Sequence, residues 1–172
     1  MRQRHRRPTC TFAFAIVVSA ALAGCALGPY SPSGVPAGAS REQIQSVMGP
    51  PTAFYTMPDG HARLEYTRQP AGRHTFMVDL DADGHMARWE NVLDENHFAA
   101  IVPGMRGPDV LRLIGPPSFT ARYVRPTPGI TWNYRFDTIQ RCIVFQVDFN
   151  QATGQVLESA YPSDPGCPDE YL

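Results

Sequence analysis

The sequence predicts an α+β protein, built as a tandem repeat in which each copy has a short helix followed by a three-stranded antiparallel sheet. Two ungapped segments, residues 38–51 and 104–117, both begin with glycine and both end with Gly-Pro-Pro. Each segment is followed by runs in which apolar and polar residues alternate, as they do in half-buried strands. A repeat of this length predicts two copies of one structural unit. We place the copies at residues 35–97 and 98–161, with a C-terminal tail at 162–172.

The first 24 residues have the order of a bacterial secretory signal. Basic residues fill most of positions 2–7, an apolar run extends from Phe12 to Leu22, and Leu-Ala-Gly-Cys ends at Cys25. The run is shorter than the roughly 20 apolar residues that cross a bilayer. The tetrapeptide resembles the lipobox of bacterial lipoproteins, which implies cleavage before Cys25 and its acylation with fatty acid such as palmitate. An ordinary cleaved signal or a signal anchor is the alternative.

The residue after Cys25 indicates which of the two bacterial membranes holds the lipid. In lipoproteins of the enterobacterial type an aspartate at this position favours retention in the inner membrane, and here the residue is Ala26. The resemblance therefore implies the outer membrane, with the protein facing the periplasm. Residues 25–34, which are rich in Gly, Pro and Ser, are predicted to form the lipidated cysteine and a flexible tether.

The charge balance argues against one class of partner. The chain has 15 basic and 16 acidic residues, and four of the arginines lie in the predicted signal, so the mature part is mildly acidic. Nucleic acid favours a basic face, and we expect no nucleic-acid partner. No second apolar run is long enough to cross a membrane.

Each repeated segment is predicted to be a short helix. In the first, Ser40 can cap the N-terminus, and Gln43 three residues later completes a capping box. In the second, Pro108 suits the first helical turn. Gly49 and Gly115 are expected to end the helices. Apolar residues spaced i, i+3, i+4 form a stripe on each helix, which we expect to pack against its own sheet. The stripes consist of Ile44, Val47 and Met48, and of Val110, Leu113 and Ile114.

Three strands are expected in each copy. Asp83-Gly84 and Thr153-Gly154 provide the hairpin turns between the last two strands. Residues 96–101 are predicted to add a short helical turn between the copies. The strands are expected at 64–66, 74–81 and 85–92 in the first copy, and at 132–134, 143–150 and 155–161 in the second.

The cysteines predict a disulfide bond. Cys10 lies in the signal and Cys25 is predicted to be acylated, which leaves Cys142 and Cys167. Two cysteines in an oxidising compartment are expected to pair. Such a bridge would fix the Pro- and Gly-rich tail to a strand. Two free thiols are the alternative, because a sequence does not give the distance between them.

One motif predicts a different chemistry. Asp79, Asp81, Asp83 and Gly84, with Glu90 at the twelfth position, satisfy the pattern of an EF-hand calcium loop. An EF-hand loop joins two helices, however, whereas the residues before Asp79 alternate as in a strand. The second copy keeps the turn without the acids. We therefore interpret the motif as an acidic β-turn and predict no metal site, with calcium binding as the alternative.

The remaining polar residues do not form a catalytic set. No Gly-x-Ser-x-Gly motif is present, and no cysteine nucleophile is left once the predicted bridge forms. The histidines lack the i, i+4 spacing of a zinc pair, and we expect His61, His74 and His85 to be exposed strand residues. Glu90 and Asp94 are interpreted as a solvated strand end rather than as paired acids. The sequence therefore predicts a non-enzymatic protein that needs no cofactor and functions through its surfaces.

The order of these features resembles a known family. A glycine, a capped helix, Gly-x-Pro, and strands with an aromatic pair and an Asp-x-x-Gly turn are similar to the SmpA/OmlA (BamE-like) domain of outer-membrane lipoproteins. The resemblance covers residues 35–97 and 98–161, although BamE has one such domain and this chain has two. Tandem copies are also similar to the β-lactamase-inhibitor-protein fold.

The resemblance implies that the protein is a lipid-anchored periplasmic protein-binding module, which supports outer-membrane protein assembly or envelope integrity. It implies two partners: the membrane, reached through the N-terminal lipid, and an envelope protein such as a component of the outer-membrane assembly machinery. The alternative is a membrane-tethered inhibitor of a periplasmic enzyme, with the loops at 57–60, 69–73 and 126–130 as candidate insertions.

Overall fold

The computed structural model describes residues 30–124, 128–139 and 142–167. The predicted signal, Cys25 and the first part of the tether lie outside these residues. Within the described ranges, no helix has the length and apolar character needed to cross a membrane.

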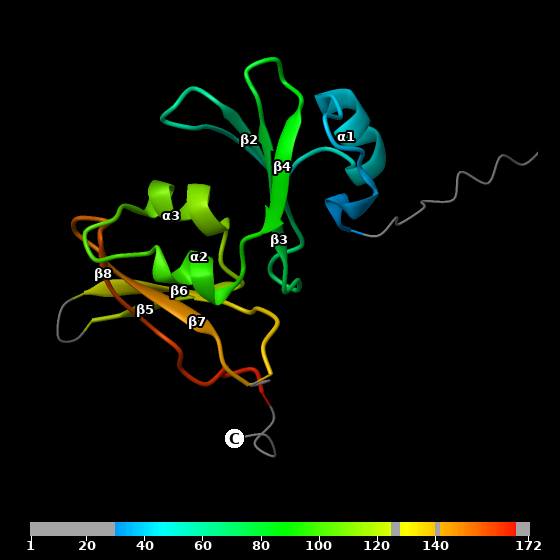
Figure 1. The fold of residues 1–172 in the computed structure, drawn as a ribbon. Coiled ribbons are helices and arrows are strands. Elements are labelled where there is room, and N and C mark those ends of the chain that lie inside the picture. Colours follow the sequence, from blue (N-terminus) through cyan, green and yellow to red (C-terminus); the bar gives the residue numbers. More distant parts are fainter. Residues whose placement is uncertain (1–29, 125–127, 140–141, 168–172) are drawn as a thin grey trace, which may run out of the picture.

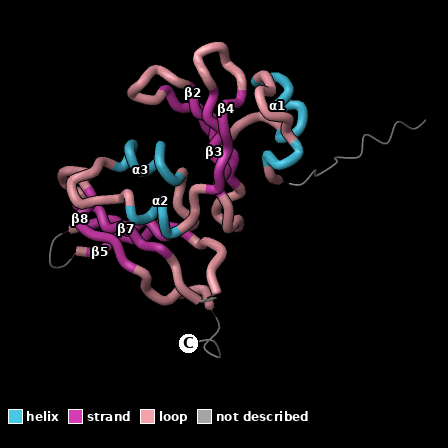
Figure 2. Tube along the Cα trace, in the orientation of Figure 1, coloured by secondary structure: helices cyan, strands magenta, loops and turns pink. Residues whose placement is uncertain are grey.

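The chain forms two successive units with the same order of elements (Figure 1). Each unit has one helix followed by four strands, and each set of strands forms its own antiparallel sheet, in the order β1-β2-β3-β4 and β5-β6-β7-β8 (Figure 2). A short 3₁₀ helix, η1, precedes the first unit, and α2 joins the two. The elements are η1 (Pro32–Gly34), α1 (Arg41–Met48), β1 (Ala53–Thr56), β2 (Ala62–Thr67), β3 (Thr75–Leu80), β4 (Met86–Asn91), α2 (Glu95–Ala99), α3 (Gly107–Ile114), β5 (Phe119–Tyr123), β6 (Gly129–Tyr134), β7 (Phe145–Asn150) and β8 (Val156–Ala160).

The predicted α+β class and the duplicated element order are present, but the prediction of three strands per sheet is wrong. The additional strands, β1 and β5, each follow a Pro-Pro pair and add to the edge of a sheet. In β1, Ala53 pairs with Glu65, and in β5, Phe119 pairs with Asn133. Edge strands are half-solvated, and Phe54 is 50% exposed, so these segments lack the alternation of buried residues that reveals the other strands.

The helix ends follow the predicted chemistry. The side chain of Ser40 accepts from the Gln43 amide, and the Gln43 side chain accepts from the Ser40 amide, so the capping box is present. Gly49 and Gly115 end α1 and α3 with φ of 80° and 75°, which favour glycine. Of the predicted stripe residues, Ile44, Val110 and Ile114 are buried, Met48 and Leu113 are half-buried, and Val47 is 44% exposed.

A first core lies between α1 and one face of the first sheet. Ile44 of α1 is fully buried there against Leu64, Val78 and Leu80 from the central strands. These residues lie on one face of the sheet, but the other face of β2 and β3 is also largely buried, so the prediction of half-buried strands is wrong for these two. Figure 1 shows α1 on the side of this sheet opposite to the second unit.

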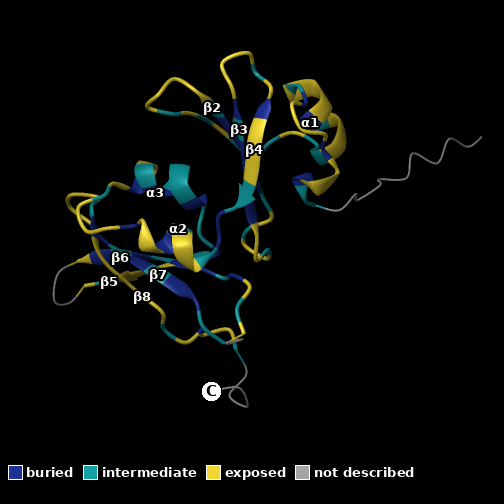
Figure 3. Ribbon diagram, viewed as in Figure 1, coloured by how far each residue is buried: buried dark blue, intermediate teal, exposed yellow. Residues whose placement is uncertain are grey.

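A second core surrounds α3, which lies between the two sheets (Figure 1). Val110 and Ile114 of α3 pack on the second sheet with Phe145 and Val147, and Met77 of the first sheet belongs to the same buried cluster. Figure 3 shows the buried residues of β6 and β7 beneath α2 and α3. The expectation that each stripe packs only against its own sheet therefore holds for α1 and is incomplete for α3.

The face of the first sheet that meets α3 is buried although it is polar. Glu65 accepts hydrogen bonds of 2.7 Å from the hydroxyls of Tyr55 and Thr52. The guanidinium of Arg63 donates to both carboxylate oxygens of Asp79, at 2.5 and 2.9 Å. Because buried polar groups are stable only when they are hydrogen-bonded, this pairing lets a polar strand face lie inside the molecule. Asp79 is thus held within the first sheet, and its partner Arg63 is the residue that reaches the second unit.

Candidate protein-binding surface

The first described residue is fixed to the first unit. The hydroxyl of Tyr30 donates a 2.6 Å hydrogen bond to the carbonyl of Thr67, and the guanidinium of Arg68 lies 4.2 Å from the centre of the Tyr30 ring. Pro32 and Val35 are buried. Tyr30 is thus a fixed point only five positions after Cys25, whose lipidation remains a prediction.

The predicted disulfide bond is present. Cys142 and Cys167 are joined, with their Cα atoms 5.8 Å apart. The tail is also held by Asp164, whose amide donates to the Cys142 carbonyl at 2.8 Å and whose carboxylate accepts from Arg135 at 2.6 and 3.0 Å. The hydrogen bond from Arg135 lowers the pKa of the Asp164 carboxyl. The bridge therefore belongs to a wider attachment of the tail to the second sheet.

The EF-hand-like motif is an acidic β-turn. Asp79 is paired with Arg63 and Arg88. One carboxylate oxygen of Asp81 accepts from the amides of Asp83 and His85 within the turn. The hydrogen bond from the His85 amide lowers the pKa of Asp81. The described part of the chain contains no group of three or more His, Cys, Asp or Glu side chains that could hold a metal ion. The carboxylates of Asp79 and Asp81 are thus hydrogen-bonded within the first sheet and its hairpin turn.

The other candidate polar residues are spread over the molecule. His61, His74 and His85 are exposed as expected, but each lies just before a strand rather than in it. A ring nitrogen of His74 lies 2.8 Å from a carboxylate oxygen of Asp137 in the second unit. Asp94 caps α2 by accepting from the His97 amide. The His97 ring lies 2.9 Å from Asp94 and 3.4 Å from Glu90. Glu90 and Asp94 are thus joined through a histidine at the connection between the units, and they are structural partners there.

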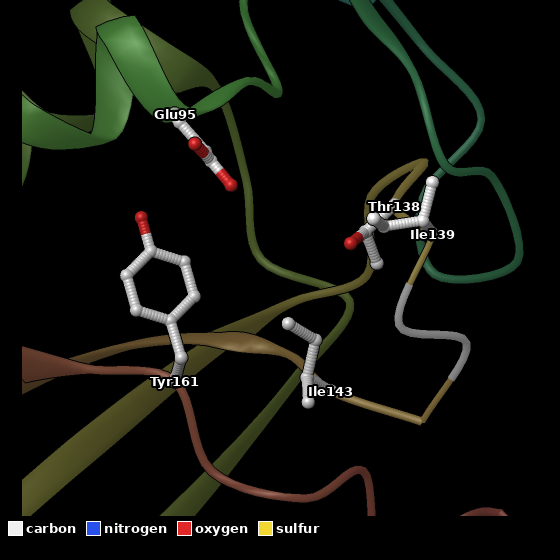
Figure 4. A pocket seen from close by; sticks show the side chains of 5 residues that line it. All are labelled: Glu95, Thr138, Ile139, Ile143 and Tyr161. Carbon is white, nitrogen blue, oxygen red and sulfur yellow. The ribbon is translucent and has the colours of Figure 1, made fainter.

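An open pocket of about 420 Å³ lies where α2, the β6–β7 connection and the end of β8 meet. Among the described lining residues, Glu95 is the charged one, and Tyr161 lies opposite Thr138 (Figure 4). Figure 4 shows the Tyr161 hydroxyl pointing toward Glu95, with the Thr138 and Ile139 segment on the other side. The lining residues are Glu95, Thr138, Ile139, Ile143 and Tyr161.

Tyr161 is held from below by an aromatic cluster. Its ring centre lies 5.3 Å from that of Phe145 and 6.2 Å from that of Phe136, and Phe98 of α2 stacks on Phe145 at 4.1 Å. Tyr161 is nevertheless 47% exposed. Partial burial, and then the charge of Glu95, raise the pKa of Tyr161. The pocket therefore presents a fixed aromatic ring with a protonated hydroxyl beside a carboxylate.

The strand that leads to this pocket, β8, is at the edge of its sheet. The amide of Gly104 donates to the Val156 carbonyl at 2.8 Å, and the Val156 amide donates to the Met105 carbonyl. The α2–α3 connection thus covers the start of the strand. Residues 157–160 are exposed, and no described strand pairs with their outer side. An unpaired strand edge offers a row of backbone donors and acceptors to another chain.

A second pocket lies at the N-terminal end of α3. It has a volume of about 360 Å³ and an almost entirely apolar lining, in which Trp132 and Phe149 pack with their ring centres 4.5 Å apart. A Cβ atom on Gly107 would lie 3.3 Å from the Trp132 ring, so this glycine lets α3 approach β6 closely.

The sequence analysis did not identify the residues of the 420 Å³ pocket. Glu95 and Tyr161 are far apart in the sequence and belong to no motif. An aromatic residue directly after an exposed strand was the available signal for Tyr161, but nothing in the sequence brings Glu95 to it.

Comparison with known proteins leaves the family open. No protein-family model matches the chain, and no curated protein matches it. Among solved structures, the chain is similar to a protein of Streptococcus mutans that has been provisionally named a β-lactamase inhibitor protein. The two share 11% sequence identity over 77% of this chain and 87% of that one, with a TM-score of 0.35. This similarity is too low to indicate a shared fold or function.

Proposed function

We propose that this protein is a protein-binding module of the bacterial envelope, held on the outer membrane by lipid on Cys25 and facing the periplasm. The observation that supports the binding role is the junction of two features at one place. The exposed edge of β8 runs directly into the pocket that contains Tyr161 and Glu95. A strand edge supplies hydrogen bonds to a partner's main chain, and an adjoining pocket selects its side chains.

Tyr161 suits the role of an anchor. Partly exposed tyrosines contribute large contact area at small conformational cost and are frequent in binding surfaces. The rings of Phe136 and Phe145 hold Tyr161 in place before a partner arrives, which reduces the entropy lost on binding.

The contacts between the two units make the surface a fixed platform. Arg73 of the first unit donates a 3.0 Å hydrogen bond to the carbonyl of Phe136, and His74 pairs with Asp137, so the β2–β3 loop holds the β6–β7 connection beside the pocket. Lipid on Cys25 would restrict this platform to the membrane surface and raise its effective concentration for membrane partners.

The proposal is tested by site-specific crosslinking in cells. A photoreactive amino acid replaces Ser159 on β8, and a matched one replaces Val47 on α1, an exposed residue on the other side of the molecule. We expect position 159 to capture an envelope protein that position 47 does not capture. Equal capture at the two positions, or capture of no envelope protein at position 159, would contradict the binding role.

The lipid on Cys25 is tested separately. Cells are labelled with an alkyne fatty acid, and incorporation into the wild type is compared with that into Cys25→Ser. We expect label in the wild type alone, and reduced crosslinking at position 159 when Cys25 is replaced. An unlabelled wild type would refute lipidation. If the captured partner is an enzyme, an assay of its activity with equimolar protein distinguishes inhibition from assembly.

A further inference from the structure

We infer that the partner segment is an extended, basic stretch of polypeptide that adds to β8 as a fifth strand, with basic side chains on both faces of the extended sheet. This inference rests on the proposed binding role and specifies the chemistry of the partner. It follows from the charges that flank the free edge of β8.

The outer face beside this edge is acidic. Asp148 of β7 and Glu158 of β8 are directly opposite each other in the strand register. The Gln146 side chain donates to both carboxylate oxygens of Asp148, at 3.1 and 3.2 Å, and neither acid forms an ion pair with any described residue. Like charges directly opposite each other on adjacent strands repel. A cation delivered beside Glu158 would relieve this repulsion.

The inner face is acidic at the end of the same edge. Glu95 is the charged residue among the described lining residues of the pocket, and none of the described residues forms an ion pair with it. The neighbouring walls are the ring of Tyr161 and the aliphatic side chain of Ile143 (Figure 4). Long basic side chains bury their methylene groups against apolar walls and keep the charged end near an acid. The pocket therefore fits lysine or arginine better than an acidic or short side chain.

The register predicts the spacing of the basic residues. Glu158 of β8 and Tyr161, which directly follows the strand, are three positions apart. They point to opposite faces, because Glu158 is paired with Asp148 and Tyr161 packs in the aromatic core. A strand paired with this edge places residues separated by an odd number on opposite faces. Two basic residues at positions i and i+3 can thus reach Glu158 and the Glu95 pocket together, whereas residues at i and i+2 lie on one face.

This spacing gives a direct test. Two fluorescein-labelled nine-residue peptides of threonine and valine carry two lysines each, at i and i+3 in one and at i and i+2 in the other. Their affinities for the intact mature protein are measured by fluorescence anisotropy in detergent. We expect the i, i+3 peptide to bind more tightly, and its affinity to fall as salt concentration rises. A third peptide with the same side chains but alternate N-methylated amides should lose binding, because it cannot pair with the strand edge.

Variants of the protein identify the face that each lysine reaches. Glu95→Gln and Glu158→Gln should each weaken the i, i+3 peptide about threefold, the range for a partly exposed ion pair. Asp83→Asn makes the same charge change in the exposed turn of the first unit and should leave the affinity unchanged. Equal binding of the two lysine spacings, or equal effects of the three variants, would overturn the inference. Specific capture at position 159 alongside either result would leave the proposed binding role standing with a partner of other chemistry.

Discussion

The guanidinium of Arg63, in the first sheet, donates a 3.0 Å hydrogen bond to the backbone carbonyl of Arg112, in the last turn of α3. The carbonyls at the end of a helix have no partner within it, and the helix dipole makes this end negative, so a buried cation is favourable there. The same guanidinium pairs with Asp79. One side chain thus joins two strands of the first unit to the helix of the second.

Replacing Arg63 should therefore destabilise the whole protein. Arg63→Ala leaves the last turn of α3 and one side of Asp79 without their donors, and breaking a buried pair costs about 3–5 kcal/mol. Arg88→Ala removes the exposed partner of the same aspartate and should cost less than about 1 kcal/mol. Urea denaturation of the two variants measures the difference. Equal losses would show that the contact to Arg112 contributes nothing.

The two glycines that end α1 and α3 provide a matched pair of substitutions. Both have positive φ with ψ near 180°, a conformation that costs other residues about 1–3 kcal/mol. A Cβ atom on Gly49 meets nothing within 4 Å, but one on Gly115 would lie 2.8 Å from the Thr75 side chain. Gly115→Ala should therefore lower the thermal midpoint more than Gly49→Ala. Identical midpoints would mean that the units are not in contact at Thr75.

The tail should lose stability in acid through Asp164. The folded state holds the pKa of this carboxyl below its unfolded value, because Arg135 donates to it. Its contribution to stability is therefore present above the unfolded pKa of about 3.9 and is lost as the pH falls through the lower folded pKa. Asp164→Asn should be less stable than the wild type at pH 6, and the difference should shrink below about pH 4. Urea midpoints across this range test it; a constant difference would exclude the ionised pair as its cause.

Calcium should have no effect on stability. Arg63 and Arg88 occupy the carboxylate of Asp79, and backbone amides occupy that of Asp81, so a cation would have to displace charge-assisted hydrogen bonds. We expect no heat of binding in titration calorimetry with millimolar calcium and no change in the thermal midpoint. Micromolar binding that disappears in Asp81→Asn would refute the β-turn interpretation.

The sequence carried enough information for the helices, for three of four strands in each sheet and for the disulfide bond. Helix caps and Gly-Pro-Pro endings depend on neighbours along the chain, so Ser40, Gly49 and Gly115 could be interpreted locally. The edge strands β1 and β5 were not predicted, because their residues are largely solvated and show no run of buried positions. Phe54 points to solvent and so breaks the pattern of apolar residues that face a core.

The covered face of the first sheet could not have been predicted from the sequence. Arg63, Glu65 and Thr75 have the composition of a solvated strand face, yet all three are buried and lie against the C-terminal end of α3. What buries them is a long-range contact between the units. The binding surface has the same origin, because folding alone brings Glu95 of α2 to the residue that follows β8.

Because α3 lies between the two sheets, the two copies of the repeat depend on each other for their folding. Two copies joined in series could in principle be separated, each retaining its own interior. Here Met77, from the first copy, is fully buried in the interior of the second. A fragment that ends before α3 would expose this side chain and the polar surface around it to water. The copies have thus lost their independence, and the molecule should unfold in a single cooperative transition.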